Sequence, residues 1–488
     1  MHSYSDDDTI VAISTPAGEG GIGIVRLSGP KALSIAEAIF VSKDGGKLSK
    51  FKTHTVHYGH IIESSQLTVH SSQLKLKKQK IIIGGKLKTK NRIVDEVLLT
   101  VMRAPRTYTK EDIVEINCHG GIQATGNVMS LTMKEGARLA EPGEFTKRAF
   151  LNGRLDLSQA EAVLDVIRAK TEGSLRMAME QLSGGLSNRV KEITGLLIDA
   201  AADIEASIDF PDEGIGAGES KRLKKTVSSA LDNLEILTKS YNDGIIMKDG
   251  VLAVICGKPN VGKSSLMNLL LRRDRVIVSD IPGTTRDAVE EVINLKGIPI
   301  RIVDTAGVAK AKDSLEKESI GKTRKYIEMA DIAILVLDGS SGIDAKDLAI
   351  IDLLKDKKKI VVVNKADIAD RIGGGRLKKM FPGSRATKIS VLENTNIAAL
   401  EKNIAETVLR GGYGSLSGAA VSSLRHKEIL DKSRGCVISV MRGLSKKAHP
   451  ELLAIDLKEA ISHLGLLTGQ TVSEDILERI FEKFCIGK

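Results

Sequence analysis

The segment at residues 257–264 places the strongest limit on what this chain can fold into. It reads Gly-Lys-Pro-Asn-Val-Gly-Lys-Ser and follows the apolar run Val251–Cys256, which predicts a strand. In such a loop the glycines let backbone N–H groups surround phosphates, Lys263 reaches the β and γ oxygens, and the Ser264 hydroxyl ligates Mg²⁺. The sequence therefore predicts a P-loop nucleotide-binding domain.

Three later motifs indicate that the nucleotide carries guanine. Asp304-Thr305-Ala306-Gly307 follows a predicted strand and brings a carboxylate near Mg²⁺ and an N–H near the γ-phosphate. In Asn364-Lys365-Ala366-Asp367 the last carboxylate can accept hydrogen bonds from the N–H and NH₂ edge that guanine has and adenine lacks. Between them, Thr285 is a second hydroxyl for Mg²⁺, while the usual fifth motif is weak at Ser390-Val391-Leu392. The predicted GTP-binding residues are Asn260, Val261, Gly262, Lys263, Ser264, Ser265, Ser279, Asp280, Ile281, Pro282, Gly283, Thr284, Thr285, Asp304, Thr305, Ala306, Gly307, Asn364, Lys365 and Asp367.

The hydrolytic machinery differs from that of Ras-type GTPases. Val308 stands where a glutamine would orient the attacking water, and no arginine finger is evident. Glu316 is a candidate for the water-orienting role, and a solvated helix carboxylate is the alternative. Neutral oxygens near the phosphates could hold a monovalent cation in place of the missing positive charge. The residues that would supply them are Asn260, Ser279, Ile281 and Thr284.

Composition sets the wider limits. The 488 residues suffice for about three domains of roughly 150 residues each. No apolar run approaches the roughly 20 residues of a membrane span, and the polar, acidic start does not resemble a signal peptide, so we expect a cytoplasmic protein without membrane contact. The four cysteines, Cys118, Cys256, Cys436 and Cys485, show no paired spacing for structural zinc or disulfides.

The net charge of +10 comes largely from residues 64–92, which hold eight Lys or Arg and no acid. Such a stretch is either a solvated loop or a set of phosphate contacts for RNA. Aromatic residues make up 3% of the chain and tryptophan is absent, which argues against a stacking platform for single-stranded RNA.

The texture of the sequence changes along the chain. Short β-rich runs at 9–14, 23–27, 97–102 and 113–118 predict a mixed α+β domain, and helical spacing begins after residue 143. We predict a multidomain α/β protein in which a G domain with a mixed, mostly parallel sheet is inserted into an all-helical domain. The expected divisions are an α+β domain at 1–125, a helical domain in two parts at 126–249 and 411–488, and the G domain at 250–410.

Five segments outside the G domain carry a family signature. They lie at residues 8–26, 117–121, 142–157 and 208–213 and in the terminal Cys485-Ile486-Gly487-Lys488. Together they resemble the MnmE (TrmE) family of tRNA modification GTPases over nearly the whole chain. Arg154 stands where some members have lysine, Ser279 replaces a commoner threonine, and residues 64–92 exceed the typical loop.

The resemblance implies a potassium-stimulated GTPase that works with the flavin-containing protein MnmG. Together they would add an aminomethyl-type (carboxymethylaminomethyl) group to carbon 5 of the wobble uridine in certain tRNAs. The resemblance also implies a homodimer through the N-terminal domain, a heterotetramer with MnmG, and a 5-formyl- or 5,10-methylene-tetrahydrofolate donor. The implied folate contacts are Arg26, Glu115, Arg154 and Lys488.

The family likeness also bears on single residues. Glu316 falls at the position of the water-orienting glutamate, and the four cation-site residues fall where the family holds potassium. Cys485 would approach the folate chemistry as a nucleophile or acid, with a structural tail residue as the alternative. Two rival functions stay open: a ribosome-assembly GTPase, and a folate-dependent aminomethyltransferase with a regulatory GTPase.

Overall fold

The computed structural model describes residues 8–63, 92–209, 217–274, 290–304, 324–409 and 420–488. They form two compact units, one of residues 1–160 with 471–488 and one of residues 161–470. None of the helices in these ranges combines the length and the apolarity that a membrane span requires.

A seven-stranded sheet forms the centre of the first unit within the described ranges, in the order β3-β4-β5-β6-β2-β1-β7. Its pairs are antiparallel except for the parallel pair of β1 and β7. The strands are β1 (Ile10–Ile13), β2 (Gly23–Ser28), β3 (Phe40–Ser42), β4 (Thr55–Glu63), β5 (Arg92–Met102), β6 (Ile113–Cys118) and β7 (Arg138–Leu139). The helices are α1 (Ala32–Ile39), α2 (Ile122–Lys134), α3 (Glu144–Leu151) and α16 (Glu474–Phe481), with a 3₁₀ turn, η1 (Leu48–Lys50).

The core of this unit follows from strand alternation. In β2, Val25 and Leu27 are fully buried, and in β6 Val114 and Ile116 are fully buried. These side chains pack with α1 and α2 in one apolar cluster. Because α2 and β7 belong to this sheet and its cover, the predicted boundary near residue 125 falls inside a helix of the first unit, and the domain limits stay predictions.

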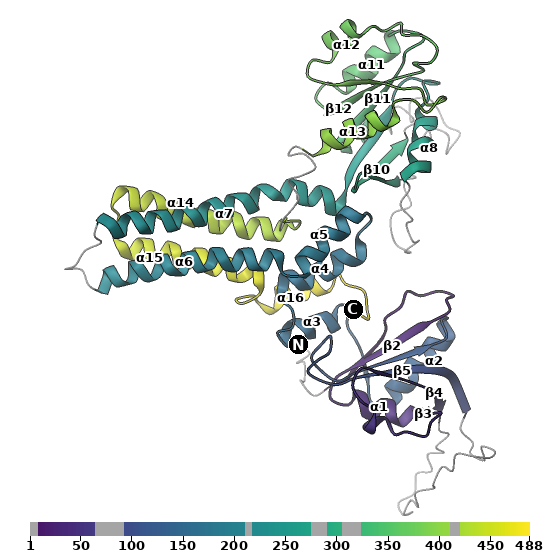
Figure 1. Ribbon diagram of the computed structural model, residues 1–488, viewed down its shortest axis with the longest axis vertical. Helices are drawn as coiled ribbons and strands as arrows, with labels where there is room; N and C mark the ends of the chain where they lie inside the picture. Colours follow the sequence, from purple (N-terminus) through teal and green to yellow (C-terminus); the bar gives the residue numbers. More distant parts are fainter. Residues whose placement is uncertain (1–7, 64–91, 210–216, 275–289, 305–323, 410–419) are drawn as a thin grey trace, which may run out of the picture. The chain divides into compact units, whose positions relative to one another are not determined.

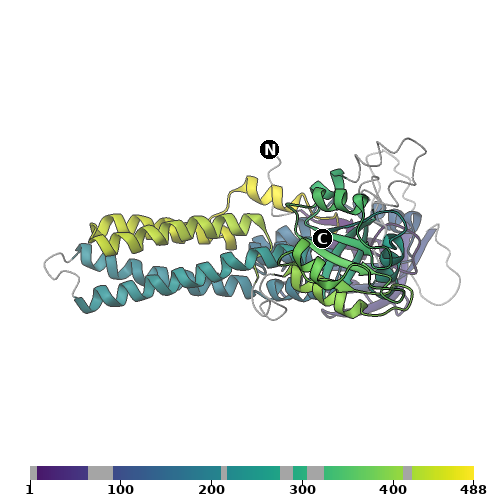
Figure 2. The same ribbon diagram turned by 90° about the horizontal axis from the view of Figure 1, so that it is seen from above.

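Long helices make up one part of the second unit. Figures 1 and 2 show α6 (Gly185–Asp209), α7 (Ala217–Asp249), α14 (Leu424–Lys446) and α15 (Pro450–Thr468) running side by side. Each contributes an apolar stripe at helical spacing; in α6 the buried stripe includes Leu186, Val190, Ile193, Leu197 and Ile204. The stripes meet in a single core. The shorter helices are α4 (Leu157–Arg168) and α5 (Glu172–Leu182).

The chain between α7 and α14 forms the G domain. Its described strands lie in the order β13-β12-β11-β8-β10-β9, and only the β9–β10 pair is antiparallel. Every residue of β8 and β11 is buried, as expected for central parallel strands covered on both faces. The strands are β8 (Val251–Cys256), β9 (Glu290–Leu295), β10 (Ile298–Asp304), β11 (Ile332–Asp338), β12 (Lys359–Asn364) and β13 (Ala386–Lys388). Among the described residues, the helices include α8 (Lys263–Asp274), α11 (Ala345–Leu353), α12 (Gly374–Met380) and α13 (Ile397–Val408), and residues 324–329 are also helical.

This arrangement confirms the predicted fold class. An α+β domain comes first, and a mostly parallel G-domain sheet interrupts a helical domain whose helices precede and follow it in the chain.

Candidate functional site

The phosphate-binding loop joins β8 to α8. Gly262 has a φ of 98°, and a Cβ there would lie 2.3 Å from the side-chain nitrogen Nδ2 of Asn364. Only glycine therefore fits at this position. Asn260 adopts a left-handed conformation with φ 64°. The buried Lys263 ammonium donates to the carbonyls of Gly257 and Lys258, both at 2.9 Å. The lysine is therefore folded over the curve of the loop in which a phosphate would be bound.

Asn364 ties this loop to the base-recognition side. From the end of β12 its amide donates to the carbonyl of Val261 at 2.8 Å, and its amide oxygen accepts from the N–H of Val391 at 3.1 Å. Asn364 is buried, and its bond to Val261 is shielded from water, while the bond from Val391 is partly buried. Next to it, Lys365 reaches across to the Asp338 carboxylate at 2.6 Å, while Asp367 is exposed where a base could meet it.

A further lysine braces the loop from outside. Lys258 Nζ lies 2.9 Å from Asp344 and 3.0 Å from Asp347, at the start of α11. Both carboxylates outweigh the effect of burial and raise the pKa of Lys258. The loop is thus held from α11 as well as from β12.

The first unit contains a second constellation, built from distant parts of the chain. Arg26 of β2 and Glu115 of β6 are cross-strand neighbours, and Arg26 Nε lies 2.7 Å from Glu115 Oε1. Arg26 Nη1 also donates to the carbonyl of Gly487 at 3.3 Å, and its guanidinium lies 5.7 Å from the Phe145 ring centroid. Strand pairing thus aligns a cation, a carboxylate and the C-terminal tail.

The tail is fixed by backbone contacts. The Ser14 hydroxyl donates to the Gly487 carbonyl at 3.1 Å, and the Gly143 N–H donates to the Cys485 carbonyl at 3.4 Å. Gly487 has a φ of 92°, and a Cβ there would lie 2.5 Å from the carbonyl oxygen of Ile13. The thiol-bearing Cys485 is exposed, and Lys488 follows directly after this anchored glycine.

Arg154 contacts Tyr108, which packs against the apolar cluster that contains Phe145. Its guanidinium is 4.7 Å from the Tyr108 ring centroid, and the Tyr108 hydroxyl is 3.0 Å from that of Thr146. Burial raises the pKa of Tyr108, against the effects of Thr146 and of the Arg154 and Arg26 charges. Tyr108 and Arg154 also line a cavity of about 410 Å³ together with Arg106 and Lys110, so this hollow suits an anion.

Comparisons with known proteins cover the whole of this architecture. A family model described as the MnmE helical domain matches residues 157–485, and one described as the GTP-binding protein TrmE N-terminus matches residues 9–154. The tRNA modification GTPase MnmE of Carboxydothermus hydrogenoformans is 44% identical over 99% of this chain and 100% of its own length. The chain belongs to the MnmE family. Two further MnmE proteins support this membership. That of Acetivibrio thermocellus is 42% identical over 99% of both chains, and that of Lactiplantibacillus plantarum is 40% identical over the full length of both.

As a member of the MnmE family, the chain is a GTP hydrolase with a P-loop G domain. Several residues that the family likeness singles out lie outside the described ranges, and Asp304 is described only as the end of β10. Those outside are Ser279, Asp280, Ile281, Pro282, Gly283, Thr284, Thr285, Thr305, Ala306, Gly307 and Glu316, together with most of the Lys-rich segment.

Sequence reasoning missed three residues that contact members of these candidate sites. Asp338, which holds Lys365, ends the buried strand β11, and that position was a usable signal. Tyr108 and Phe145 lie in a loop and a helix whose link to Arg154 and Arg26 depends on tertiary packing. No local sequence pattern predicts such a contact.

Proposed function

We propose that this protein uses GTP hydrolysis to control modification of carbon 5 of the wobble uridine in certain tRNAs. In this proposal it acts with flavin-containing MnmG, and a 5-formyl- or 5,10-methylene-tetrahydrofolate supplies the one-carbon unit of a carboxymethylaminomethyl-type group. The observation that carries the proposal is the meeting of Arg26, Glu115 and Gly487 in a chain that also holds a P-loop. A GTPase that served only as an assembly switch has no use for that constellation.

In the G domain, we assign Mg²⁺ to Ser264 and Thr285, and K⁺ to Asn260, Ser279, Thr284 and the Ile281 carbonyl. Mg²⁺ and K⁺ would spread the negative charge that develops on the phosphates. Glu316 is assigned to orient the attacking water in the absence of a glutamine. This assignment is supported by the positive φ angles of Asn260 and Gly262, which curve the loop, and by Lys263, whose ammonium lies along its carbonyls.

In the first unit, the assigned folate contacts are Arg26, Glu115, Arg154 and Lys488. The Glu115 carboxylate can accept from the amino edge of a pterin, and the cations suit the carboxylates of folate's glutamate tail. The cavity beside Tyr108, with Arg106, Lys110 and Arg154 on its wall, supports an anionic tail at that place. Cys485, anchored nearby through its own carbonyl, is the assigned nucleophile or acid.

The proposal extends to partners. We assign a homodimer through the first unit, a heterotetramer with MnmG, and a cytoplasmic location where GTP and tRNA are available. The Lys-rich residues 64–92 could add phosphate contacts to tRNA.

The deciding experiment is nucleoside analysis of tRNA from a strain in which this gene is deleted. The proposal expects the modified wobble uridine to disappear, to return with the wild-type gene, and to stay absent with Arg26→Gln. Lys134→Gln, which removes an exposed cation paired with Glu63 in the same unit, should restore it. Unchanged tRNA together with accumulated ribosomal precursors would instead support the assembly GTPase.

A further inference from the structure

The helical part of the second unit carries a cluster of metal-type ligands that shares no residue with either site described above. We propose that Cys436 of α14 and Glu459 and His463 of α15 bind one divalent transition-metal ion of the zinc class. None of these three residues belongs to the nucleotide site or to the folate constellation.

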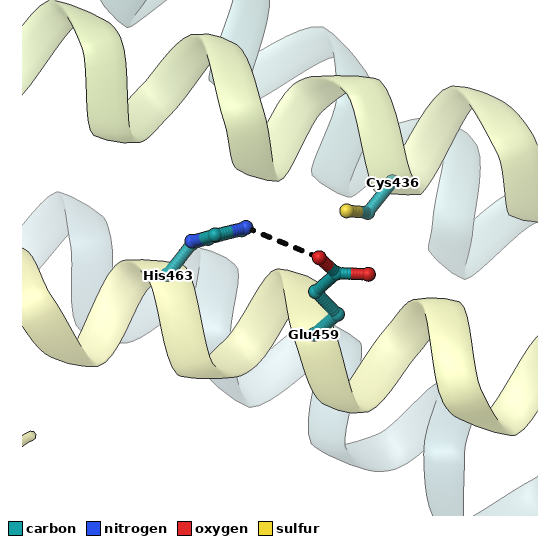
Figure 3. Close-up of side chains that lie close together, drawn as sticks. All are labelled: Cys436, Glu459 and His463. Carbon is teal, nitrogen blue, oxygen red and sulfur yellow. Dashed lines mark ion pairs between the residues drawn. The ribbon is translucent and has the colours of Figure 1, made fainter.

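The three donor atoms already lie near one another. The Cys436 thiol, the Glu459 carboxylate and the His463 ring each offer an atom, and these atoms lie within 4.8 Å of one another. His463 Nε2 is 3.6 Å from Glu459 Oε1. Figure 3 shows the thiol and the carboxylate approaching each other from the two helices, with the imidazole directed at the same carboxylate.

A bound ion would require only small movements. Zinc bonds of about 2.0–2.3 Å place tetrahedral ligand atoms about 3.3–3.8 Å apart. The His463–Glu459 separation already falls in this range. Rotation of the half-buried thiol and the exposed carboxylate would close the remaining gap of about 1 Å.

The backbone holds the ligands in register. Glu459 and His463 are four residues apart on α15 and therefore share a face. Beside them, the buried Ser433 hydroxyl donates to the Ala460 carbonyl at 3.1 Å, which fixes α14 against α15 one turn from Cys436. The helices also share the bundle core, so the two sides of the cluster are placed by rigid elements.

The local charge favours a cation. The carboxylates of Glu459 and Asp456 both lie close enough to the half-buried Cys436 thiol to act on it electrostatically. A divalent ion would replace the thiol proton and relieve this accumulation of negative charge. The sulfur, nitrogen and oxygen donor set suits zinc or cobalt rather than magnesium. Three protein ligands leave a fourth position for water.

The test is metal binding by the full-length, tag-free protein after chelator treatment, with excess Mg²⁺ and GDP to fill the G domain. We expect one equivalent of Zn²⁺ in competition with a chromogenic chelator, and a thiolate-to-metal charge-transfer band with Co²⁺. Cys436→Ser should abolish the band, and both Cys436→Ser and His463→Gln should lower Zn²⁺ affinity more than about tenfold, since even outer-shell changes cost that much.

Two control variants separate this site from other thiols and imidazoles. Cys485→Ser removes the other exposed or half-exposed thiol, and His449→Gln removes an exposed imidazole just before α15. Both should bind like the wild type, and far-ultraviolet circular dichroism should show all variants folded. A Co²⁺ band that persists in Cys436→Ser, or that vanishes in Cys485→Ser, overturns the proposal.

Discussion

The Asn364 amide donates a 2.8 Å hydrogen bond to the carbonyl of Val261, so the end of β12 holds the phosphate-binding loop in place. The same side chain accepts from Val391 on the base-recognition side. One buried residue therefore couples the shape of the phosphate site to that of the base site.

Asn364→Asp tests this coupling, because aspartate keeps the acceptor for Val391 and loses the donor for Val261. An unpaired buried carbonyl costs about 1–3 kcal/mol, which corresponds to roughly tenfold in an equilibrium constant for each 1.4 kcal/mol. We expect GDP affinity, measured with a fluorescent analogue, to fall about tenfold or more. Asn403→Asp loses bonds to Arg385 and Thr387 elsewhere in the G domain and should leave affinity near wild type.

Asp367→Asn should change the preferred base. The exposed carboxylate can accept from the N–H and NH₂ groups of guanine, and an amide can instead donate to the carbonyl that xanthine carries at that position. Each hydrogen bond to a charged group is worth about 1.5–3 kcal/mol, so GDP affinity should fall at least roughly tenfold while xanthosine diphosphate gains. An equal loss of affinity for GDP and xanthosine diphosphate would contradict the assignment. So would the same change in base preference in the control variant Asp352→Asn, at an exposed position.

Glu316→Ala should keep GDP binding and lose most GTP turnover in KCl with Mg²⁺. Loss of a group that orients the attacking water costs typically about 10²–10⁴ in rate. The wild type should be faster in KCl than in matched NaCl if Asn260 and its partners hold potassium. Glu328→Ala, which removes only an exposed ion pair with Arg324, serves as the control, and normal turnover by Glu316→Ala would reject the catalytic role.

Gly487→Ala should weaken binding of 5-formyltetrahydrofolate while GTP turnover stays unchanged. The new Cβ meets the Ile13 carbonyl at 2.5 Å and forces a left-handed alanine, which by itself costs about 1–2 kcal/mol. The tail should therefore leave Arg26 in a large share of molecules, and affinity measured by calorimetry should drop about tenfold. Ile486→Ala, at a half-exposed neighbour, should bind 5-formyltetrahydrofolate like the wild type. If Gly487→Ala binds it as tightly as Ile486→Ala does, the tail lies outside the folate site.

Protonation of Glu161 in acid should lower the stability of the helical part of the second unit. Burial alone would raise the pKa of Glu161, but His426 and Arg425 outweigh burial and hold it well below its usual value. Arg425 lies 2.8 Å from Glu161 Oε2, and the fully buried His426 bonds to the same oxygen. Because the folded-state pKa is depressed, the stabilisation is complete above the usual 4.5 and is lost as pH falls below it.

The matching variant is Glu161→Gln, which leaves the Arg425 guanidinium and the His426 ring without the carboxylate that both contact. We expect about 3 kcal/mol of lost stability at pH 7 in urea unfolding followed by circular dichroism. The difference from wild type should shrink as pH falls below 4.5. Glu235→Gln, in an exposed pair with Lys239, should show neither effect. A gap between Glu161→Gln and wild type that is constant with pH would refute the ionic explanation.

Local patterns predicted the parts of this fold that local forces determine. The β-rich run at 113–118, in which Glu115 and Asn117 alternate with apolar residues, predicted the observed bounds of β6. The continuous apolar run at 251–256 predicted those of β8, and the glycine-rich loop followed β8 as predicted. The run at 97–102 proved to be the second half of the longer β5, whose first half holds three charged residues and no buried one. The two-residue β7 exists only because β1 pairs with it, which no local pattern could indicate.

The sites divide in the same way. The P-loop and base-recognition motifs are contiguous and could be read directly, whereas the Asn364–Val261 bond joins residues 103 positions apart. Cys436 and His463 become neighbours only when α14 and α15 pack in one register. A search for paired cysteine spacing therefore missed that cluster.

The bond from Ser14 to Gly487 spans 473 positions of sequence. This sequence separation has a consequence for biosynthesis. Strand β1 and Ser14 leave the ribosome early, yet Gly487 is made only after the helical and G-domain segments. The first unit must then wait, incompletely closed, while residues 161–470 emerge and fold. During that interval Ser14 and Arg26 lack the Gly487 carbonyl that both bond in the folded protein, so closure by Gly487 is a late step in maturation.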